Sequence, residues 1–233
     1  MVRAALAVLD EVGLDGLTMR RLAERLGLKS PSIYWHVRDK DELLSLIADA
    51  ICAEIEPPDG DEPWTAQLEA MGWEYRRVLL KHRDAALVLA NTLPVGPNRL
   101  RLAERMLTVL VQAGFAPGVA ASSGLLLLDF ATNAVIEEGR SQAMSAAFGA
   151  DEDGAEAGEF RQWFASLPAE QYPTLVALAA DLTNTDARER FRFGIEVLLS
   201  GLLARKGEER RAGHDSPPSS GTNGSDRDPR STP

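Results

Sequence analysis

The chain of 233 residues has one cysteine, Cys52, and three widely spaced histidines. A single thiol forms no intramolecular disulfide, which is typical of a reducing compartment. The histidines and the cysteine lack zinc-site spacing. No apolar run reaches the roughly 18 residues of a membrane span, because polar residues interrupt the longest candidate, 125–136. The first residues lead straight into an amphipathic pattern, so no signal peptide is predicted. We therefore expect a cytoplasmic protein with no metal, no cofactor and no membrane partner.

Positive charge is also in short supply. Acidic residues outnumber basic ones by 35 to 25, which gives a net charge of −10. This balance argues against a general binder of nucleic acid or anionic membranes. The excess is uneven, however: residues 1–45 hold seven basic and seven acidic side chains, and residues 46–233 hold eighteen and twenty-eight. The amino-terminal part is therefore neutral and is compatible with binding at a specific site.

Strand signals are missing, since no segment alternates convincingly between apolar and polar residues. Apolar residues instead recur every three to four positions, which predicts an all-α fold. The proline-rich segment 56–63 reads as a rigid connector. Residues 206–233 contain no Val, Ile, Leu, Phe, Met, Trp or Tyr. Because such a segment buries too little apolar surface to offset its ordering entropy, it is predicted to be disordered.

Two short helices near residue 25 have helix-turn-helix spacing. Thr18 is a good N-cap for a helix over 19–26, and Gly27 can supply the left-handed residue that ends it. Ser30 is expected to cap a second, very short helix with Pro31 at its first position. A short helix, a glycine turn and another short helix are typical of DNA-binding proteins.

The second of these helices is crowded with unusual side chains. Residues 30–36 read SPSIYWH, with two aromatics and a histidine in one short element. Hydroxyl, imidazole and aromatic groups suit phosphates, sugars and base edges in a major groove, and basic residues flank the helix. The alternative is that the Tyr34–Trp35 pair only plugs a core. The helix-turn-helix spacing favours the DNA-binding interpretation.

Residues 17–44, LTMRRLAERLGLKSPSIYWHVRDKDELL, resemble the DNA-binding domain of the TetR family of transcriptional repressors. The YWHVxxK stretch is highly characteristic, and the likeness is greatest to the tetracycline repressor branch. It continues more weakly through Trp64, 79–84 and 114–115 to about residue 203. The resemblance implies a three-helix DNA-binding domain at 1–46, joined by a long helix to a ligand-binding and dimerisation core at 47–205, with the tail at 206–233.

The resemblance also implies roles for residues of the DNA face. Arg20, Ser30 and Pro31 would face base edges, and Lys29 lies in the turn. A helix N-terminus at Lys40 would favour a phosphate. The remaining residues expected to contact the sugar-phosphate backbone are Thr18, Ser32, Tyr34, Trp35, His36 and Lys40.

The core domain would dimerise through helices at 119–138 and 188–203, which the resemblance implies form a four-helix bundle across a two-fold axis. The apolar stripe of the last helix is suited to such an interface; the alternative is that the stripe is only intramolecular core. Its residues are Phe191, Ile195, Leu198, Leu199 and Leu202.

The ligand pocket departs from the branch it resembles. Tetracycline repressors take the drug as a magnesium chelate completed by a histidine, and the matching position here, Leu89, cannot ligate a metal. Ile55 and Met71 replace two polar residues, while Tyr75, Thr92 and Glu137 keep the family's chemistry. We therefore expect a more hydrophobic ligand with no obligatory Mg²⁺. The expected lining is Ile55, Met71, Tyr75, Leu89, Thr92, Met106, Leu127, Asn133 and Glu137.

Together these patterns predict a repressor that binds a palindromic operator in double-stranded DNA as a homodimer. A small-molecule effector would release it, with the helix at 40–55 as the lever between the two sites. Two alternatives remain. One is the same fold controlled by a partner protein without an inducer. The other is an all-helical enzyme using His82, Asp84, Glu137 and Glu138, which lacks a recognisable nucleophile–base pair.

Overall fold

The computed structural model describes residues 1–58, 60, 62–148, 161–183 and 186–214. Over these residues the chain forms helices and turns without any strand, so the predicted all-α class is confirmed. In chain order the helices are α1 (Val2–Gly16), α2 (Met19–Leu26), α3 (Ser30–Ile33), α4 (Lys40–Cys52), α5 (Trp64–Lys81), α6 (Ala85–Ala90), α7 (Pro97–Gln112), α8 (Pro117–Phe148), α10 (Pro173–Ala177), α11 (Ala179–Leu182) and α12 (Ala187–His214).

The capping signals around α2 are confirmed. The hydroxyl oxygen of Thr18 accepts a hydrogen bond of 3.2 Å from the Arg21 N–H, and Gly27 ends α2 in the left-handed region with φ of 67°. The expected cap at Ser30 is wrong, because α3 already includes Ser30 and its N-cap is Lys29. The chain enters the helix one residue earlier than predicted, and α3 is only four residues long.

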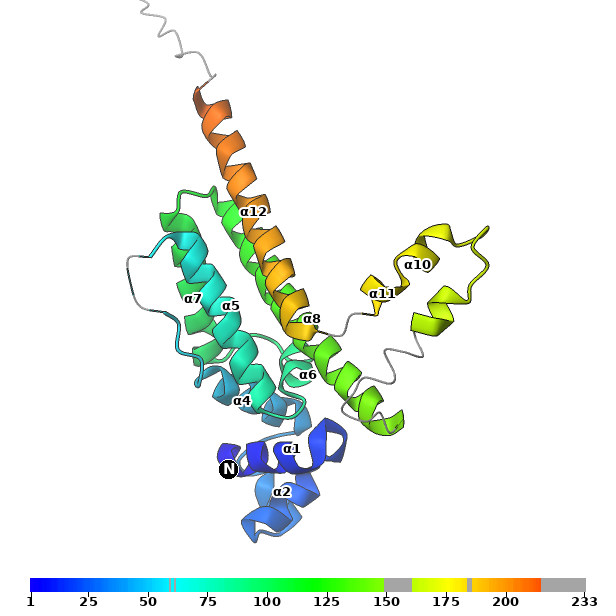
Figure 1. Cartoon of the computed structure of the whole chain (residues 1–233). Coiled ribbons are helices and arrows are strands. Elements are labelled where there is room, and N and C mark those ends of the chain that lie inside the picture. The colour runs from blue at the N-terminus through cyan, green and yellow to red at the C-terminus, as the bar shows by residue number, and fades with distance from the viewer. Residues whose placement is uncertain (59, 61, 149–160, 184–185, 215–233) are drawn as a thin grey trace, which may run out of the picture.

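The helices form a small unit and a larger bundle (Figure 1). Helices α1 to α3 pack together at one end, and α4 leads from them into the bundle. In the bundle, α8 packs against α5, α7 and α12, and α4 packs against α6 and α7. The segment from residue 161 to α11 projects from the bundle as an arm, with Trp163, Tyr172 and Leu178 exposed.

The small unit and the bundle share one hydrophobic core. It runs from Leu9 and Leu22 through Ile47 to Val88 and Val135, all with at most 6% of their surface exposed. A second cluster, around Leu110 and Phe115, fills the far end of the bundle. Since α4 contributes to the shared core along its length, a shift of α4 must disturb both parts of the molecule.

The apolar stripe of α12 is intramolecular core. Phe191 and Ile195 are each 1% exposed, and Leu199 and Leu202 are also buried against the same chain. The proposed use of this stripe between subunits is therefore wrong for these residues. Other apolar residues of α12, Phe193 at 69% and Val197 at 52%, are exposed instead.

Helix α12 also corrects the expected tail. Residues 206–214, predicted to be disordered, continue the helix to His214, and 215–233 lie outside the described residues. The extension is rich in Arg, Lys and Glu, which favour a helix without burial in a core. At its start, the Lys206 ammonium lies 5.7 Å from the ring centres of both Trp64 and Phe115, a cation–π arrangement.

One segment of α8, Pro117–Ser141, is long and apolar enough to cross a membrane. The core helix of a soluble protein passes the same criterion. In this structure α8 lies at the centre of the bundle, in contact with α5, α6, α7 and α12. The segment is therefore weak support for a membrane span.

Candidate functional site

The aromatic residues expected on the DNA face lie at the tip of the small unit. Tyr34, Trp35 and His36 form a turn after α3 rather than part of the helix. The turn is held by His36 N–H donating to the Ile33 carbonyl at 2.8 Å. Ile33 and Val37 are buried and anchor it, while Tyr34 is 55% and Trp35 is 89% exposed. Packing does not explain this exposure, so the core-plug alternative is excluded for Tyr34 and Trp35.

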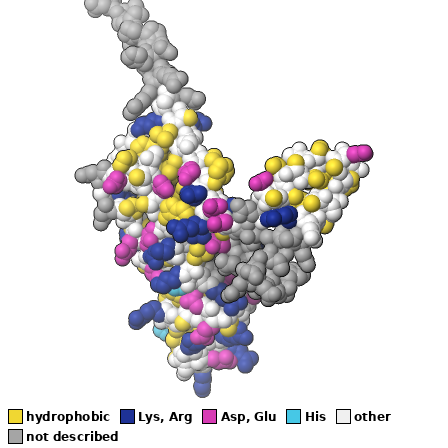
Figure 2. Space-filling view, in the orientation of Figure 1, with side chains coloured by type: hydrophobic (Ala, Val, Ile, Leu, Met, Phe, Trp, Pro, Cys, Tyr) yellow, Lys and Arg dark blue, Asp and Glu magenta, His cyan; other side chains and the backbone are white. Residues whose placement is uncertain are grey.

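The other expected DNA-contacting side chains lie on the same unit. Figure 2 shows Lys and Arg side chains, mixed with acidic ones, over the end formed by α1 to α3. Ser32 and Lys40 are half-buried, and the side chain of Ser30 lies outside the described residues. The exposed members are Thr18, Arg20, Lys29, Pro31, Tyr34, Trp35 and His36.

Two of the expected cations already have protein partners. The Arg20 Nε donates to Glu24 at 2.9 Å, and this hydrogen bond raises the pKa of Arg20. The Lys40 ammonium donates to the Leu14 carbonyl at 3.2 Å, so it holds the last turn of α1. A phosphate contact by either residue would have to share or replace these bonds.

The amino end of α4 is occupied by carboxylates. Asp39 caps the helix by accepting from the Glu42 N–H at 2.8 Å. Glu42 in turn accepts from the Arg38 backbone N–H at 2.7 Å, and this bond holds the pKa of Glu42 below its usual range. Because Asp39 and Asp41 surround the helix end, the dipole there is already compensated. A DNA phosphate expected at this helix N-terminus would therefore approach nearby carboxylates.

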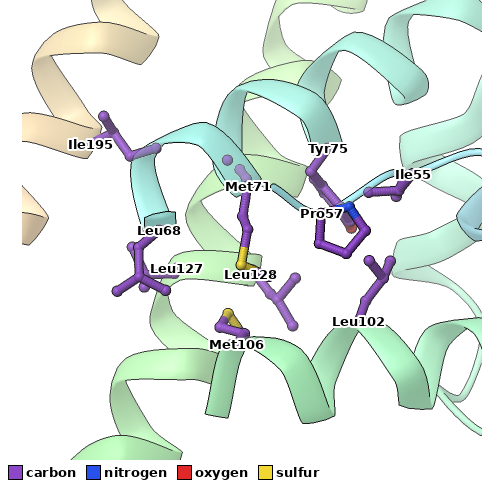
Figure 3. A pocket seen from close by; sticks show the side chains of 12 residues that line it. Ile55, Pro57, Leu68, Met71, Tyr75, Leu102, Met106, Leu127, Leu128 and Ile195 are labelled. Carbon is purple, nitrogen blue, oxygen red and sulfur yellow. The ribbon is translucent and has the colours of Figure 1, made fainter. Parts of the chain in front are cut away.

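The expected ligand pocket is divided into two cavities. The first is enclosed by apolar side chains and measures about 40 Å³, room for one or two waters (Figure 3). Met71 from α5 and Met106 from α7 point toward each other across it. Of the expected residues, those that line it are Ile55, Met71, Tyr75, Met106 and Leu127; those that sequence reasoning missed are Pro57, Leu68, Gly72, Leu102, Leu128, Ala131 and Ile195.

The second cavity is larger and more polar, with a volume of about 420 Å³. Four of the expected residues line it: Tyr75, Leu89, Thr92 and Asn133. Its other lining residues include Cys52, Pro94, Arg99, Asp129 and Thr132, which sequence reasoning missed.

Tyr75, Leu102 and Leu128 line both cavities and form the partition between them. The Tyr75 hydroxyl lies 2.8 Å from Thr132 Oγ1, which fixes the ring across the partition. Burial raises the pKa of Tyr75 to about 12, so the phenol is neutral at physiological pH.

Glu137 does not line either cavity, and the expectation for it is wrong. Its carboxylate lies on the surface of α8, 2.6 Å from Arg140. The next residue, Glu138, points inward and accepts two hydrogen bonds from Arg76, at 2.9 and 2.7 Å. Adjacent residues of a helix face different directions, so a one-residue difference in alignment exchanges a buried carboxylate for an exposed one.

Arg99, which lines the larger cavity, and Asp49 fix the chain between α6 and α7. The Arg99 guanidinium donates to the carbonyls of Leu89, Thr92 and Leu93 and so closes the end of α6. Asp49 of α4 accepts from the backbone N–H groups of Asn98 at 2.8 Å and Arg99 at 3.0 Å, capping α7 from outside. The contacts of Asp49 join residues about 50 positions apart, and no local sequence signal predicts them.

Helix α4 connects the DNA face to both cavities. It begins at Lys40, on the predicted DNA face, and ends at Cys52, which lines the larger cavity. Ile55 and Pro57, just past its end, line the smaller one. Cys52 is 2% exposed, and burial raises the pKa of its thiol to about 11.

The connector after α4 is pinned from α7. Arg101 donates to the Ile55 carbonyl at 3.3 Å, and Arg105 donates to the Pro58 carbonyl at 3.1 Å. The backbone beside the smaller cavity is therefore held at two points.

A second joint links the small unit to the bundle. His82 lies between the carboxylates of Asp10 and Glu54, 3.1 Å from each. The Leu14 N–H donates to Asp84 Oδ2 at 2.8 Å, and the Arg83 N–H donates to Asp10 at 3.1 Å. His82 and Asp84 therefore hold α1 against the bundle.

The residues of the enzyme alternative thus have separate partners. His82 and Asp84 contact α1, Glu137 pairs with Arg140, and Glu138 pairs with Arg76. In the part of the chain that the structure describes, no three His, Cys, Asp or Glu side chains group as ligands for a metal ion.

Two family models cover most of the chain. Residues 1–47 match "Bacterial regulatory proteins, tetR family", and residues 56–206 match "Tetracyclin repressor-like, C-terminal domain". The first match contains the helix-turn-helix, and the second contains the lining of both cavities except for Ile55 and Cys52.

Individual relatives agree with these matches. The chain is 36% identical over 212 residues to the tetracycline repressor protein class A from transposon 1721 of Escherichia coli, covering 88% of this chain and 90% of the relative. ActR of Streptomyces coelicolor, solved with actinorhodin, superposes with a TM-score of 0.78 at 38% identity, covering 87% and 93% of the two chains. TetR-Q116A of Acinetobacter baumannii AYE, solved with minocycline, superposes with a TM-score of 0.65 at 29% identity, covering 87% and 94%. The chain therefore belongs to the TetR family of transcriptional regulators, whose members are not enzymes.

Proposed function

We propose that this regulator is a cytoplasmic repressor that binds a palindromic operator as a homodimer and leaves it when a small, largely apolar ligand binds. The observation that carries the DNA half is the exposure of Tyr34 and Trp35 at 55% and 89% on a buried anchor. Large aromatic side chains are kept in water at a cost unless a partner covers them. Double-stranded DNA is the partner that a helix-turn-helix fits.

On the operator, α3 would lie in the major groove. Arg20 and Pro31 would face base edges together with Ser30, and Lys29 would reach either bases or backbone. The side chains assigned to the sugar-phosphate backbone are Thr18, Ser32, Tyr34, Trp35, His36 and Lys40. Because residues 1–45 carry no net charge, affinity would depend on two correctly spaced units on one site and would be weak on random DNA.

The homodimer would form through the outer faces of α8 and α12. Leu125 and Leu126 of α8 are 65% and 53% exposed, and Phe193 and Val197 of α12 are 69% and 52% exposed. The two helices are packed side by side, and exposed apolar residues on neighbouring helices are typical of a symmetric helical interface. Leu125 also lines the larger cavity, so in the proposed dimer that cavity would lie next to the interface. A second copy would place two recognition units about one DNA turn apart.

The ligand would enter the larger cavity and displace the partition at Tyr75. Its volume of about 420 Å³ is in the range of roughly 300 to 1,000 Å³ that small-molecule sites occupy. Relatives solved with actinorhodin and with minocycline suggest a ligand of several fused rings. With Leu89 at the position of a metal-ligating histidine, such a ligand would bind without Mg²⁺.

Release would follow if the ligand prefers the form of the dimer with the wrong spacing for DNA. Cys52, Ile55 and Pro57 bring the end of α4 to the cavities. A ligand that pushes these lining residues apart would move α4, and with it the DNA face.

A gel-shift titration with the DNA upstream of the gene tests the DNA half. The wild-type chain should retard a palindromic fragment at low salt, and Tyr34→Ala and Trp35→Ala should weaken binding by at least about tenfold. Tyr172→Ala, which removes an aromatic that is 43% exposed on the arm, is the matched control and should bind normally. Absence of binding to any palindrome there would overturn the proposal.

Sedimentation tests the dimer. Phe193→Glu should yield monomers because it places a charge in the apolar interface. Leu100→Glu, at a residue of α7 that is 55% exposed, should leave the dimer intact. A dimer unaffected by Phe193→Glu would exclude this surface.

One rival is a repressor of the same fold controlled by a partner protein. The cavity with the apolar lining expected for the ligand favours this rival, because at about 40 Å³ it holds no ligand without rearrangement and only the larger, more polar cavity has room for one. Thermal-shift screening of multi-ring compounds, with and without EDTA, separates the two proposals, since a ligand of the native state raises the Tm. Uniformly unchanged Tm values would favour the partner-controlled regulator.

A further inference from the structure

A third cavity, of about 500 Å³, lies between the end of α5, the start of α6 and the later part of α8. None of its lining residues belongs to the two cavities described above. We call it the joint cavity, because His82, Arg83 and Asp84, which hold α1 against the bundle, form one of its walls. Its volume is that of a small-molecule site.

The joint cavity combines an apolar floor with cations at its rim. Leu79, Ala86 and Val135 are buried and form the floor. The two cations are Arg83, in the loop before α6, and Arg140, on α8; both line the joint cavity. This pairing suits a molecule with an apolar body and one anionic group, since guanidinium binds carboxylate or sulfonate through paired N–H donors.

Both arginines keep donors for such a ligand. Arg83 donates Nη1 to the Glu11 carbonyl at 3.1 Å, and Arg140 donates Nη1 to Glu137 at 2.6 Å. Among the described residues, their other guanidinium N–H groups have no hydrogen-bond partner, and each guanidinium carries five. The acidic wall residue, Asp84, already accepts from the Leu14 N–H through Oδ2.

The wall of the joint cavity is also a strained segment. Asp84 has a φ of 57°, the left-handed region, and it is the one non-glycine residue with positive φ in the described ranges. Opposite it, Gly13 has a φ of 74°. Such positions persist where surrounding contacts hold them and often occur at switches. A ligand against Arg83 would therefore act on the contact between the bundle and α1.

We propose that the joint cavity binds a small amphipathic anion, a ring-containing apolar molecule with one carboxylate or sulfonate. Occupancy changes operator affinity through residues 82–84. The claim that the joint cavity binds this anion depends on the cavity alone. The claim that binding changes operator affinity rests on the proposed function.

The experiment blocks the joint cavity with a large side chain at one of its lining residues. Gly139 of α8 lines the joint cavity, and a Cβ added there meets no atom within 4 Å. Gly139→Trp therefore introduces an indole at a position with room for its Cβ, and Gly139→Ala is the control that removes the glycine without adding bulk. Ala90→Trp introduces the same bulk at a residue that lines the 420 Å³ cavity instead. The probe is 8-anilinonaphthalene-1-sulfonate, an aromatic sulfonate, titrated into the full-length chain and followed by calorimetry.

Gly139→Ala should bind one more probe molecule per chain than Gly139→Trp, because only the Trp variant blocks the joint cavity. Ala90→Trp should still bind the probe in the joint cavity. Arg140→Gln should weaken it roughly three- to tenfold. Equal stoichiometry for the two Gly139 variants, or loss of all binding in Ala90→Trp, would overturn the site.

Gel shifts test the regulatory half. The probe should change the half-saturation of operator binding by Gly139→Ala and not by Gly139→Trp. An unchanged value in both refutes regulation through the joint cavity. If the wild-type chain binds no operator, the proposed function is refuted instead. Calorimetry on the free protein then still tests whether the joint cavity binds the probe.

Discussion

The Oδ2 atom of Asp84 accepts a hydrogen bond of 2.8 Å from the backbone N–H of Leu14. The bond joins the residue that precedes α6 to the end of α1, 70 positions earlier. Its geometry depends on left-handed backbone on both sides, at Asp84 with φ of 57° and at Gly13 with φ of 74°. The connection between the DNA-binding unit and the bundle therefore places strict demands on two residue types.

Asp84→Ala should lower the free energy of unfolding by about 2 kcal/mol, because it removes the acceptor for Leu14 and places alanine in a left-handed conformation. Asp84→Asn should cost less, since its amide oxygen can accept the same bond and asparagine tolerates this region. Urea denaturation of the two variants measures the difference. Equal losses would show that the hydrogen bond and the backbone conformation are not what Asp84 contributes.

Gly13→Ala should weaken the same joint. The added Cβ would lie 2.7 Å from Asp84 Oδ2 and 2.9 Å from Arg83 Nε, in a backbone conformation that alanine rarely adopts. We expect a loss of about 1–3 kcal/mol. Gly207→Ala in α12, where a Cβ meets nothing within 4 Å, should be neutral or stabilise by up to about 1 kcal/mol. Thermal unfolding of both variants provides the measurement; a neutral Gly13→Ala would contradict the tight fit.

The buried pair of Arg76 and Glu138 should show strong coupling. Their side chains are 12% and 13% exposed, and the Arg76 guanidinium also lies 5.5 Å from the Phe191 ring centre. Glu138→Leu should destabilise by about 3–5 kcal/mol because it leaves a buried unpaired cation, and adding Arg76→Met should recover much of that loss. Denaturation of the single and double variants completes the cycle.

The neighbouring pair of Arg140 and Glu137 is the control for that cycle. Both side chains are at least 60% exposed, so Glu137→Ala should change stability by less than about 0.5 kcal/mol. A large effect at Glu137, or none at Glu138, would reverse the assignment of the buried carboxylate.

Tyr75 should ionise only at strongly alkaline pH. Burial raises its pKa to about 12, above the ordinary value of about 10 for a tyrosine phenol. The difference between the ultraviolet titrations of the wild-type chain and of Tyr75→Phe isolates this phenol, and it should ionise near pH 12. A difference curve centred near pH 10 while the fold persists would contradict the buried position of Tyr75.

The same shift gives a sign for stability at alkaline pH. The pKa of Tyr75 is raised in the folded chain, so its contribution is fully present below about pH 10 and is lost as the pH rises toward 12. The loss should amount to about 2–3 kcal/mol. Tyr75→Phe should flatten this part of the stability profile.

Local patterns predicted the local structure well. The helical period, the Thr18 cap and the left-handed Gly27 were sufficient for α2 and for the helix-turn-helix, because each depends on residues within one or two turns. The same rule explains the errors: Ser30 is inside α3 rather than before it, and 206–214 is helical although it has no large apolar residue. The Arg, Lys and Glu residues of that segment favour a helix.

The ligand site was predicted less well because it depends on contacts distant in sequence. The expected pocket residues are divided between two cavities by Tyr75, whose partner Thr132 is 57 positions away. Asp49 capping α7 and Asp84 holding Leu14 likewise leave no trace in sequence spacing. Glu137 and Glu138 are adjacent on α8, but Glu137 faces the surface and Glu138 faces the core. The packing of the helix decides which of the two carboxylates is buried, and the sequence alone does not.

The protonated state of Cys52 makes the molecule convenient for distance measurements. With a pKa of about 11 and 2% exposure, roughly one thiol in ten thousand is ionised at neutral pH. A cysteine introduced at exposed Lys29 would therefore take up a spin label selectively, without prior removal of the native thiol. In the proposed homodimer, two labels, one on each subunit, would report the separation of the recognition units directly, before and after an effector is added.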